Sequence, residues 1–132
     1  MPTHYVAGVC NINKAEIQAR RNIGHVSLVI SLAIIALFAY LHSSISPWLG
    51  LLTALPLWVT ATGYLQAKSK FCVSHGMAGT QLADDNMKTM AKVSNTSDSV
   101  LDKAKATKMN IQTMLLGLAG GIVVAIALYL AN

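Results

Sequence analysis

Residues 28–41 read LVISLAIIALFAYL, an apolar run that contains one serine and no charge. Extended back to residue 23, it reaches the roughly 20 apolar residues that a helix needs to cross about 30 Å of hydrocarbon. Two more stretches without charge, residues 47–66 and 111–130, are equally long. Because lipid offers no hydrogen-bond partner to open backbone, and three spans cannot close a barrel, we expect three transmembrane helices in an all-α protein.

The composition agrees with an integral membrane protein. The chain has 132 residues, enough for a single domain (1–132), and is 54% hydrophobic but only 11% charged. Soluble domains carry about 25% charged residues. The apolar content excludes a disordered chain, and two cysteines are too few for a secreted disulfide scaffold.

The basic residues predict the orientation. Only the short link 42–46 separates the first two spans, so they should form a hairpin, whereas the loop 67–110 is long. All ten lysine and arginine residues lie before residue 23 or in that loop. The positive-inside rule therefore places the N-terminus and the loop in the cytoplasm and the C-terminus outside. The net charge of +5 is explained by anionic membrane lipid, and we expect no nucleic-acid partner.

Local signals predict helices outside the spans. Asn13 followed by Glu16 has the form of a capping box, so the N-terminal segment 1–22 should carry a helix that continues into the span 23–41. In residues 81–93 apolar side chains recur at roughly helical spacing with charged side chains between them, which is typical of a short amphipathic helix. That helix could bury its own apolar stripe or dock a partner. A break at residues 94–97 should cap a third helix that begins in the cytoplasm.

Two cysteines and a histidine on the cytoplasmic side form a candidate metal or thiol site. Cys72 and His75 have the C-x-x-H spacing of a chelating pair, and Cys10 should lie at a similar depth. Such a set would suit a soft metal or a redox thiol pair. The alternative is that the cysteines are small apolar fillers, since the cytoplasm keeps thiols reduced.

Other chemistry has little support in the sequence. His25 and His42 bracket the first span and neither lies at mid-depth, which disfavours haem or chlorin ligation and favours interfacial hydrogen bonding. None of the five acidic residues lies in a span, which argues against an ion pump or an ion-coupled transporter. Phosphate-binding loops and nucleophile elbows are also missing from the sequence, so we expect no enzyme.

Helix packing has stronger signals. In the third span a small residue recurs every fourth position, at Thr113, Gly117, Gly121 and Ala125. Such a stripe lets another helix approach closely, either within the same hairpin or from another subunit. Trp58 should lie near mid-membrane and pack on a helix rather than face lipid, because tryptophan in contact with lipid prefers the interface. Pro56 cannot donate a hydrogen bond to the Leu52 carbonyl, so we expect a kink in the second span there.

Several of these residues resemble a known family. The positions that carry the resemblance are Asn11, Ile12, Glu16, Arg20 and Gly24, then Thr62 and Gly63, then Cys72. In this pattern the chain, over residues 10–79, is similar to small bacterial inner-membrane hairpins that also occur fused to rhodanese domains. Ile17 and Val73 depart from it, since the family has arginine and proline there. The resemblance implies a bacterial inner-membrane protein and a dimerising hairpin.

The sequence thus favours a non-enzymatic small membrane protein. It would act by helix packing, as an accessory subunit of a larger membrane assembly or as a homo-oligomer. The alternative is a thiol or soft-metal handling protein that uses Cys10, Cys72 and His75. A third possibility, a narrow channel for neutral solutes, requires an oligomer whose spans present serine and threonine to a pore.

Overall fold

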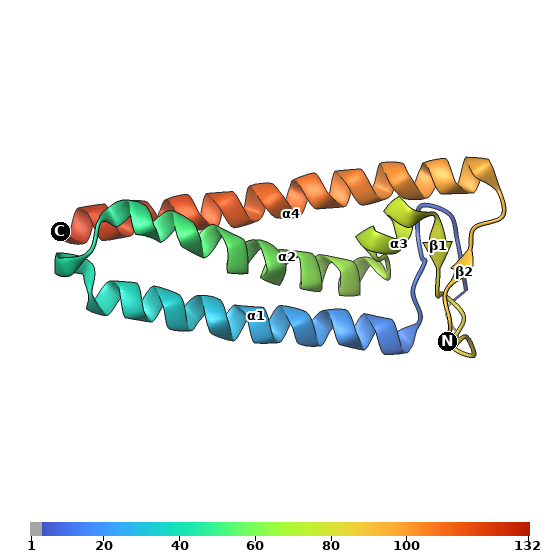
Figure 1. Cartoon of the computed structure of the whole chain (residues 1–132), viewed down its shortest axis with the longest axis horizontal. Coiled ribbons are helices and arrows are strands. Elements are labelled where there is room, and N and C mark those ends of the chain that lie inside the picture. Colours follow the sequence, from blue (N-terminus) through green and yellow to red (C-terminus); the bar gives the residue numbers. More distant parts are fainter. Residues whose placement is uncertain (1–3) are drawn as a thin grey trace.

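The computed structural model describes residues 4–132, so the first three residues of the expected N-terminal segment 1–22 lie outside the described part. Three long helical segments run side by side and a smaller folded unit closes one end (Figure 1). In chain order the elements are α1 (Lys14–Tyr40), η1 (His42–Ser44), η2 (Pro47–Thr53), α2 (Ala54–Ser69), α3 (Val73–Ala78), β1 (Thr80–Gln81), β2 (Ala91–Lys92) and α4 (Thr96–Ala131). Three helical segments, 14–40, 47–69 and 96–131, are long and apolar enough to cross a membrane, which confirms that part of the prediction.

α1 begins at its predicted cap. The Asn13 side chain accepts a hydrogen bond from the Glu16 N–H at 3.0 Å, and the helix continues without a break to Tyr40. In a capping box the glutamate side chain accepts a hydrogen bond from the backbone N–H of the N-cap residue. Here the Glu16 carboxylate instead pairs with Arg20 one turn further on, at 3.0 Å. This ion pair braces the first turns of α1.

The second span changes helix type instead of running as one α-helix. It opens with the 3₁₀ segment η2 and becomes α-helical at Ala54. Pro56 therefore lies in the first turn of α2, where a missing N–H breaks no intrahelical bond. Within η2 the Thr53 hydroxyl donates to the Gly50 carbonyl at 2.7 Å, which satisfies one carbonyl of the irregular turn. The structure has a 3₁₀ segment before Pro56, and the kink expected at this residue stays a prediction.

α4 is the longest element and leaves the bundle at one end. Its N-cap is Asn95, whose side chain accepts from the Ser97 N–H at 3.0 Å, as the break at residues 94–97 predicted. At 1.5 Å per residue its 36 residues extend about 54 Å. A bilayer core is about 30 Å thick, so α4 projects well beyond any hydrocarbon that it crosses.

The prediction of an amphipathic helix over residues 81–93 is wrong. These residues form turns between β1 and β2, which pair antiparallel with Gln81 opposite Ala91. The Asp84 side chain accepts from the Asn86 N–H at 3.0 Å, a local bond that competes with helix formation. In addition, the Leu82 N–H donates to the Asn11 carbonyl at 2.8 Å, so the N-terminal segment holds this stretch extended.

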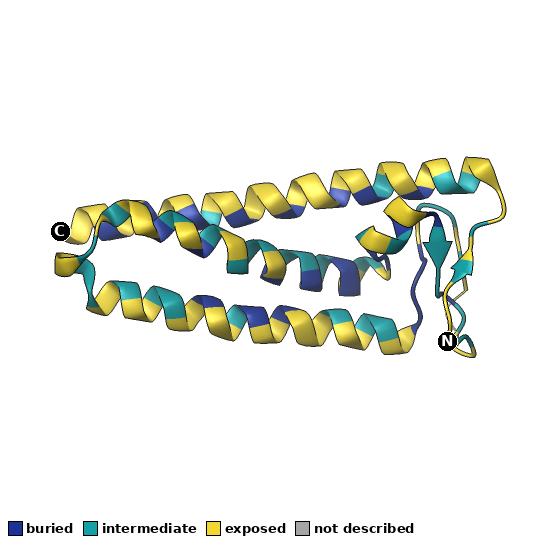
Figure 2. Cartoon of the chain, in the orientation of Figure 1, coloured by how far each residue is buried: buried dark blue, intermediate teal, exposed yellow. Residues whose placement is uncertain are grey.

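α2 lies between α1 and α4 and packs against both (Figure 1). Figure 2 shows that the buried positions face inward along the three helices, while their outer faces are exposed. α1 and α2 approach closely at Gly24 and Gly63, where a Cβ on Gly63 would lie 2.7 Å from the Gly24 backbone nitrogen. Glycine is required there because any side chain would push the helices apart.

Candidate functional site

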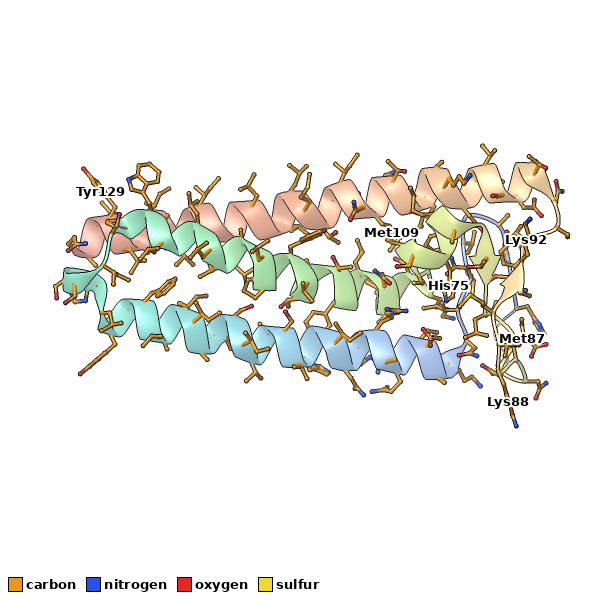
Figure 3. All side chains as sticks on the ribbon, in the orientation of Figure 1. His75, Met87, Lys88, Lys92, Met109 and Tyr129 are labelled. Atoms are coloured by element: carbon orange, nitrogen blue, oxygen red, sulfur yellow. The ribbon has the colours of Figure 1, made fainter. Side chains whose placement is uncertain are left out.

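The folded unit at one end of the bundle, here called the headpiece, comprises residues 4–13, residues 70–95 and the first turns of α4 as far as Met109. Figure 3 places His75, Met87, Lys88 and Lys92 in this unit, and Tyr129 at the opposite end of the molecule. Its apolar centre is small: Phe71, Ala106 and Met109 are buried together. Buried polar side chains therefore hold much of the headpiece in place.

Asn11 joins the N-terminal segment to the end of the second span. It is fully buried, and its side-chain oxygen accepts from the Cys72 N–H at 2.6 Å while its amide donates to the Cys72 carbonyl at 3.0 Å. Its own backbone bonds to Lys70 on one side and to Leu82 on the other. One asparagine thus connects three segments and satisfies both backbone groups of Cys72.

Asp102 on α4 also holds the N-terminal segment in place by hydrogen bonds. This carboxylate is fully buried, and it accepts from the Tyr5 hydroxyl at 2.9 Å and from the Gly8 N–H at 2.7 Å. Burial, together with the negative charge of Asp102, raises the pKa of the Tyr5 phenol well above its usual range. Gly8 has a φ of +66°, a conformation that suits glycine, so the N-terminal turn can lie flat on α4 beside Leu101.

The predicted thiol and imidazole residues all lie in the headpiece. Cys10 and Cys72 are buried free cysteines, and the Cys10 thiol donates to the Ile12 carbonyl at 3.6 Å. Burial raises the pKa of the Cys10 thiol above its ordinary value, which disfavours a reactive thiolate. His75 has its Nδ1 atom 2.9 Å from the Thr80 hydroxyl, and burial lowers the pKa of this imidazole, so it is neutral at pH 7.

The three residues are not assembled as a metal site. Among residues 4–132, no group of three or more histidine, cysteine, aspartate or glutamate side chains could hold a metal ion. The histidines at the two ends of the first span make the hydrogen bonds that the sequence suggested. His25 Nδ1 lies 2.7 Å from the Tyr64 hydroxyl oxygen, and His42 Nδ1 lies 2.9 Å from the Ala39 carbonyl oxygen.

The small-residue stripe of α4 faces the second span of the same chain. Thr113, Gly117, Gly121 and Ala125 are all buried. A Cβ on Gly117 would lie 2.6 Å from the Cβ of Trp58, and one on Gly121 would lie 2.8 Å from the Cβ of Ala54. The Trp58 indole N–H donates to the Thr113 hydroxyl at 3.2 Å. The close approach that the stripe permits is therefore made within one chain.

Three hydroxyl groups in the first two spans, those of Ser27, Ser31 and Thr60, bond to nearby backbone. Ser27 donates to the Pro56 carbonyl across the α1–α2 contact at 2.7 Å, and Thr60 donates to the same carbonyl at 2.8 Å. Ser31 donates to the carbonyl of Ser27 at 2.8 Å. These bonds satisfy the hydroxyls in an apolar setting, and they do not leave a polar row for a solute.

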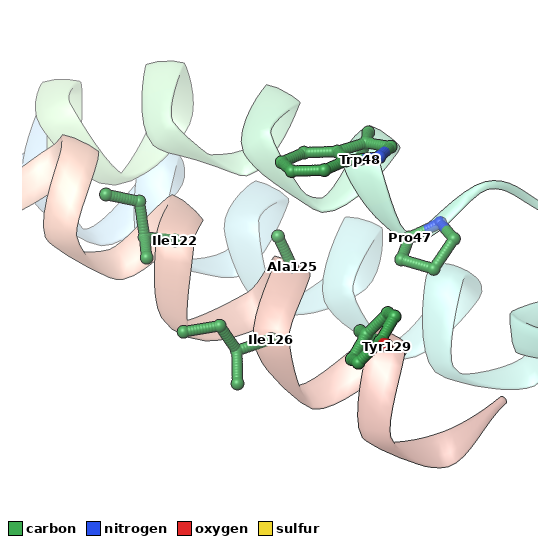
Figure 4. Close-up of a pocket in the computed structure, with 6 residues that line it drawn as sticks. All are labelled: Pro47, Trp48, Ile122, Ala125, Ile126 and Tyr129. Atoms are coloured by element: carbon green, nitrogen blue, oxygen red, sulfur yellow. The ribbon is translucent and has the colours of Figure 1, made fainter.

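A pocket of about 320 Å³ opens at the end of the bundle away from the headpiece (Figure 4). The only polar side-chain groups among its lining residues are the Trp48 indole N–H and the Tyr129 hydroxyl; the lining consists of Pro47, Trp48, Ile122, Ala125, Ile126 and Tyr129. Trp48 and Tyr129 are largely exposed, as expected of an aromatic belt at a membrane surface. With so few polar groups, the pocket has no means of orienting a substrate.

Sequence reasoning missed Asn11 and Asp102 as the residues that organise the headpiece. Asn11 was recognised only as part of a family pattern, and Asp102 only as an acidic residue early in a helix. Their partners lie 61 residues away for Asn11 and 94 and 97 residues away for Asp102. One signal was available: Asp102 is acidic and lies four and seven residues before Ala106 and Met109, on the same helix face as these apolar residues.

Comparison with protein-family models, with curated proteins and with solved structures finds no match, so a functional assignment rests on the geometry of the chain itself.

Proposed function

We propose that the chain is a non-enzymatic accessory subunit of a larger membrane assembly, with its headpiece on the cytoplasmic side of a bacterial inner membrane. The observation that carries this proposal is an apolar rim on an otherwise hydrogen-bonded headpiece. Val6, Val9 and Leu101 are 50%, 57% and 54% exposed, and all three lie outside the segments expected to be in lipid. Gly8, which lies between Val6 and Val9 in the chain, is beside Leu101. Exposed apolar side chains that adjoin in this way, as one patch, are typical of an interaction surface.

The rim is held rigidly enough to act as a docking surface. The turn that carries Val6 and Val9 is closed by hydrogen bonds between Val6 and Cys10 at 2.9 Å, and Asp102 ties Gly8 to α4. A surface fixed before binding loses little conformational entropy when a partner docks. The headpiece is also rich in lysine, which suits a position beside anionic lipid and an acidic partner surface.

The other roles have weaker support. The stripe on α4 is filled by α2, so oligomerisation through that stripe is disfavoured. A thiol or metal role is disfavoured by the burial of both cysteines and by the raised pKa of Cys10. A channel is disfavoured because the hydroxyls of Ser27, Ser31 and Thr60 bond to backbone.

The test is the composition of the particle after mild, lipid-preserving extraction from the native membrane. We expect a particle with other protein chains, much heavier than the 14.0 kDa of this chain. A variant with Val6→Ser, Val9→Ser and Leu101→Gln should lose those chains. Met90→Ser, which changes another exposed apolar residue of the headpiece, should keep them. A wild-type particle that contains only this chain would contradict the proposal.

A further inference from the structure

A recess with unsatisfied polar atoms lies between α1 and α2, just below the headpiece. Its volume is about 240 Å³. Arg20 and Ile23 line it from α1, and the lining from α2 consists of Trp58, Val59, Thr62, Gly63 and Gln66. It lies beside the Gly24–Gly63 contact, where the backbones of the two helices approach closely.

Three buried atoms of this lining have no hydrogen-bond partner within residues 4–132. They are Nε of Arg20, Oγ1 of Thr62 and Oε1 of Gln66. Gln66 is only 6% exposed. Leaving a buried polar atom unpaired is unfavourable, and such atoms are rare in native proteins. Three of them around one recess indicate a place where a bound molecule supplies the missing bonds.

The three unpaired atoms define which hydrogen-bonding groups a ligand must have. Arg20 Nε is a donor and requires an acceptor, whereas Gln66 Oε1 is an acceptor and requires an N–H or O–H donor. The Thr62 hydroxyl can serve either role. The ion pair with Glu16 uses Nη2 of Arg20, so it holds the guanidinium and leaves Nε without a partner. A phosphate oxygen is a favourable acceptor for such a guanidinium.

The recess continues into an apolar groove that runs along the helices. The two cavities share Ile23 and Val59, and the groove has a volume of about 500 Å³. Its other lining residues are Asn22, Val26, Ser27, Ile30 and Pro56. Residue numbers rise along α1 and fall along α2 away from the headpiece, so the groove leads from the polar recess toward the middle of the spans. Its outer side is open, with Val26 62% exposed.

We propose that this groove binds one glycerophospholipid. Its phosphodiester accepts a hydrogen bond from Arg20, its headgroup donates one to Gln66, and an acyl chain lies along the groove past Val26 and Ile30. The order of polar and apolar ends matches a lipid in the leaflet on the headpiece side, since Arg20 comes three residues before the apolar run that begins at residue 23. A soluble anion would make no use of the groove.

The donor required by Gln66 predicts headgroup selectivity. Ethanolamine carries N–H donors and glycerol carries O–H donors, whereas the trimethylated ammonium of choline has neither. One net hydrogen bond corresponds to about a 3- to 10-fold difference in affinity. We therefore expect phosphatidylethanolamine and phosphatidylglycerol to bind about 3- to 10-fold more tightly than phosphatidylcholine with the same acyl chains.

The experiment is native mass spectrometry of the purified full chain with each of these three lipids. Gln66→Met keeps a side chain of similar length and should remove the preference over phosphatidylcholine, while Gln112→Met, an exposed change on α4, should leave it intact. Arg20→Gln should weaken all three lipids, whereas Arg21→Gln, an exposed neighbour, should weaken none. Glu16→Gln breaks the ion pair but keeps the Arg20 donor, so some binding should remain.

Three results would overturn the proposal. The first is equal affinity of the wild-type chain for the three lipids, and the second is undiminished selectivity in Gln66→Met. The third is displacement of bound lipid by soluble glycerol phosphate at the same concentration, which would assign the recess to a soluble anion.

Trp58 provides an independent readout of position, because it lines the recess while Trp48 lies in the pocket at the other end. In a Trp48→Phe chain, Trp58 is the only tryptophan. Phosphatidylethanolamine with brominated acyl chains should quench its fluorescence more than the matching phosphatidylcholine. Equal quenching by the two lipids would place the bound lipid elsewhere.

Discussion

At the scale of single residues, Asn11 satisfies both backbone groups of Cys72 in a site that water does not reach. Asn11→Ala removes two hydrogen bonds and leaves the buried N–H of Cys72 unpaired, while the Cys72 carbonyl keeps the bond from the Gly76 N–H. We expect the free energy of unfolding in detergent to fall by about 2–4 kcal/mol. Asn86→Ala, at an exposed position of the headpiece, is the control and should change it little. A loss of under about 0.5 kcal/mol in Asn11→Ala would show that Asn11 does not organise the headpiece.

Cys10 should react slowly and should make stability depend on alkaline pH. Burial raises the pKa of its thiol in the folded chain, so the unfolded chain loses this proton first as the pH rises. The contribution to stability is therefore present at neutral pH and is lost as the pH rises through and above the ordinary thiol range. In a Cys72→Ser chain, maleimide labelling of Cys10 at pH 8 should be much slower when folded than in denaturant. Equal rates would contradict the buried position.

His75 should have the opposite pH dependence. Burial lowers the pKa of its imidazole, so on acidification the unfolded chain takes up a proton before the folded chain does. Stability should therefore fall as the pH drops below the ordinary histidine value of about 6.5. Thermal unfolding in detergent between pH 7 and pH 5 should show a shallower decline in His75→Gln than in wild type. An identical decline in both chains would exclude His75 as the source.

At the scale of elements, two glycines of α4 give opposite predictions for the same change. A Cβ on Gly117 would meet the Cα and Cβ of Trp58 and the carbonyl of Ala54, whereas a Cβ on Gly120 would meet at 2.7 Å only the flexible end of Leu57. Gly117→Ala should therefore cost about 1–3 kcal/mol through overpacking. Gly120→Ala should be neutral or stabilising by up to about 1 kcal/mol, because alanine favours helix.

The measurement is thermal unfolding of the two variants in the same detergent. Similar melting temperatures for Gly117→Ala and Gly120→Ala would mean that α2 and α4 do not approach as closely as the structure places them.

The helices that an apolar membrane environment requires could be predicted from the sequence. The segments whose conformation depends on long-range polar contacts could not. Apolar runs of about 20 residues can only be helices in hydrocarbon, and the caps at Asn13 and Asn95 are local signals. Residues 81–93 have an equally helical pattern. Their conformation is decided instead by a bond from Leu82 to Asn11, which the local sequence cannot reveal.

The candidate site shows the same limit. Spacing drew attention to Cys72 and His75, but spacing along a chain does not say that Cys72 offers its backbone, rather than its thiol, to Asn11. In the same way, the local sequence gives no sign that Thr62 and Gln66 belong to a binding recess, because Arg20 comes beside them only in the folded chain.

At the scale of the whole molecule, the charge distribution predicts the orientation. In a chain with Cys10→Ser and Cys72→Ser, we expect Ser43→Cys, in the turn between the first two spans, to react with a membrane-impermeant maleimide on intact cells. Lys88→Cys, in the headpiece, should react only after the cells are opened. Both positions are exposed, so access depends only on the side of the membrane. The reverse pattern would show that the positive-inside rule fails for this chain.

The dependence of residues 5–8 on Asp102 has a consequence for biosynthesis. A ribosome makes the carboxylate that holds Tyr5 and Gly8 97 and 94 residues after them, when the first two spans have already been synthesised. Tyr5 and Gly8 are thus made before both hairpin helices but acquire their native contacts after them. A nascent chain that stalls before residue 102 should expose residues 5–8 to proteases, so completion of the headpiece reports that synthesis has passed the first two spans.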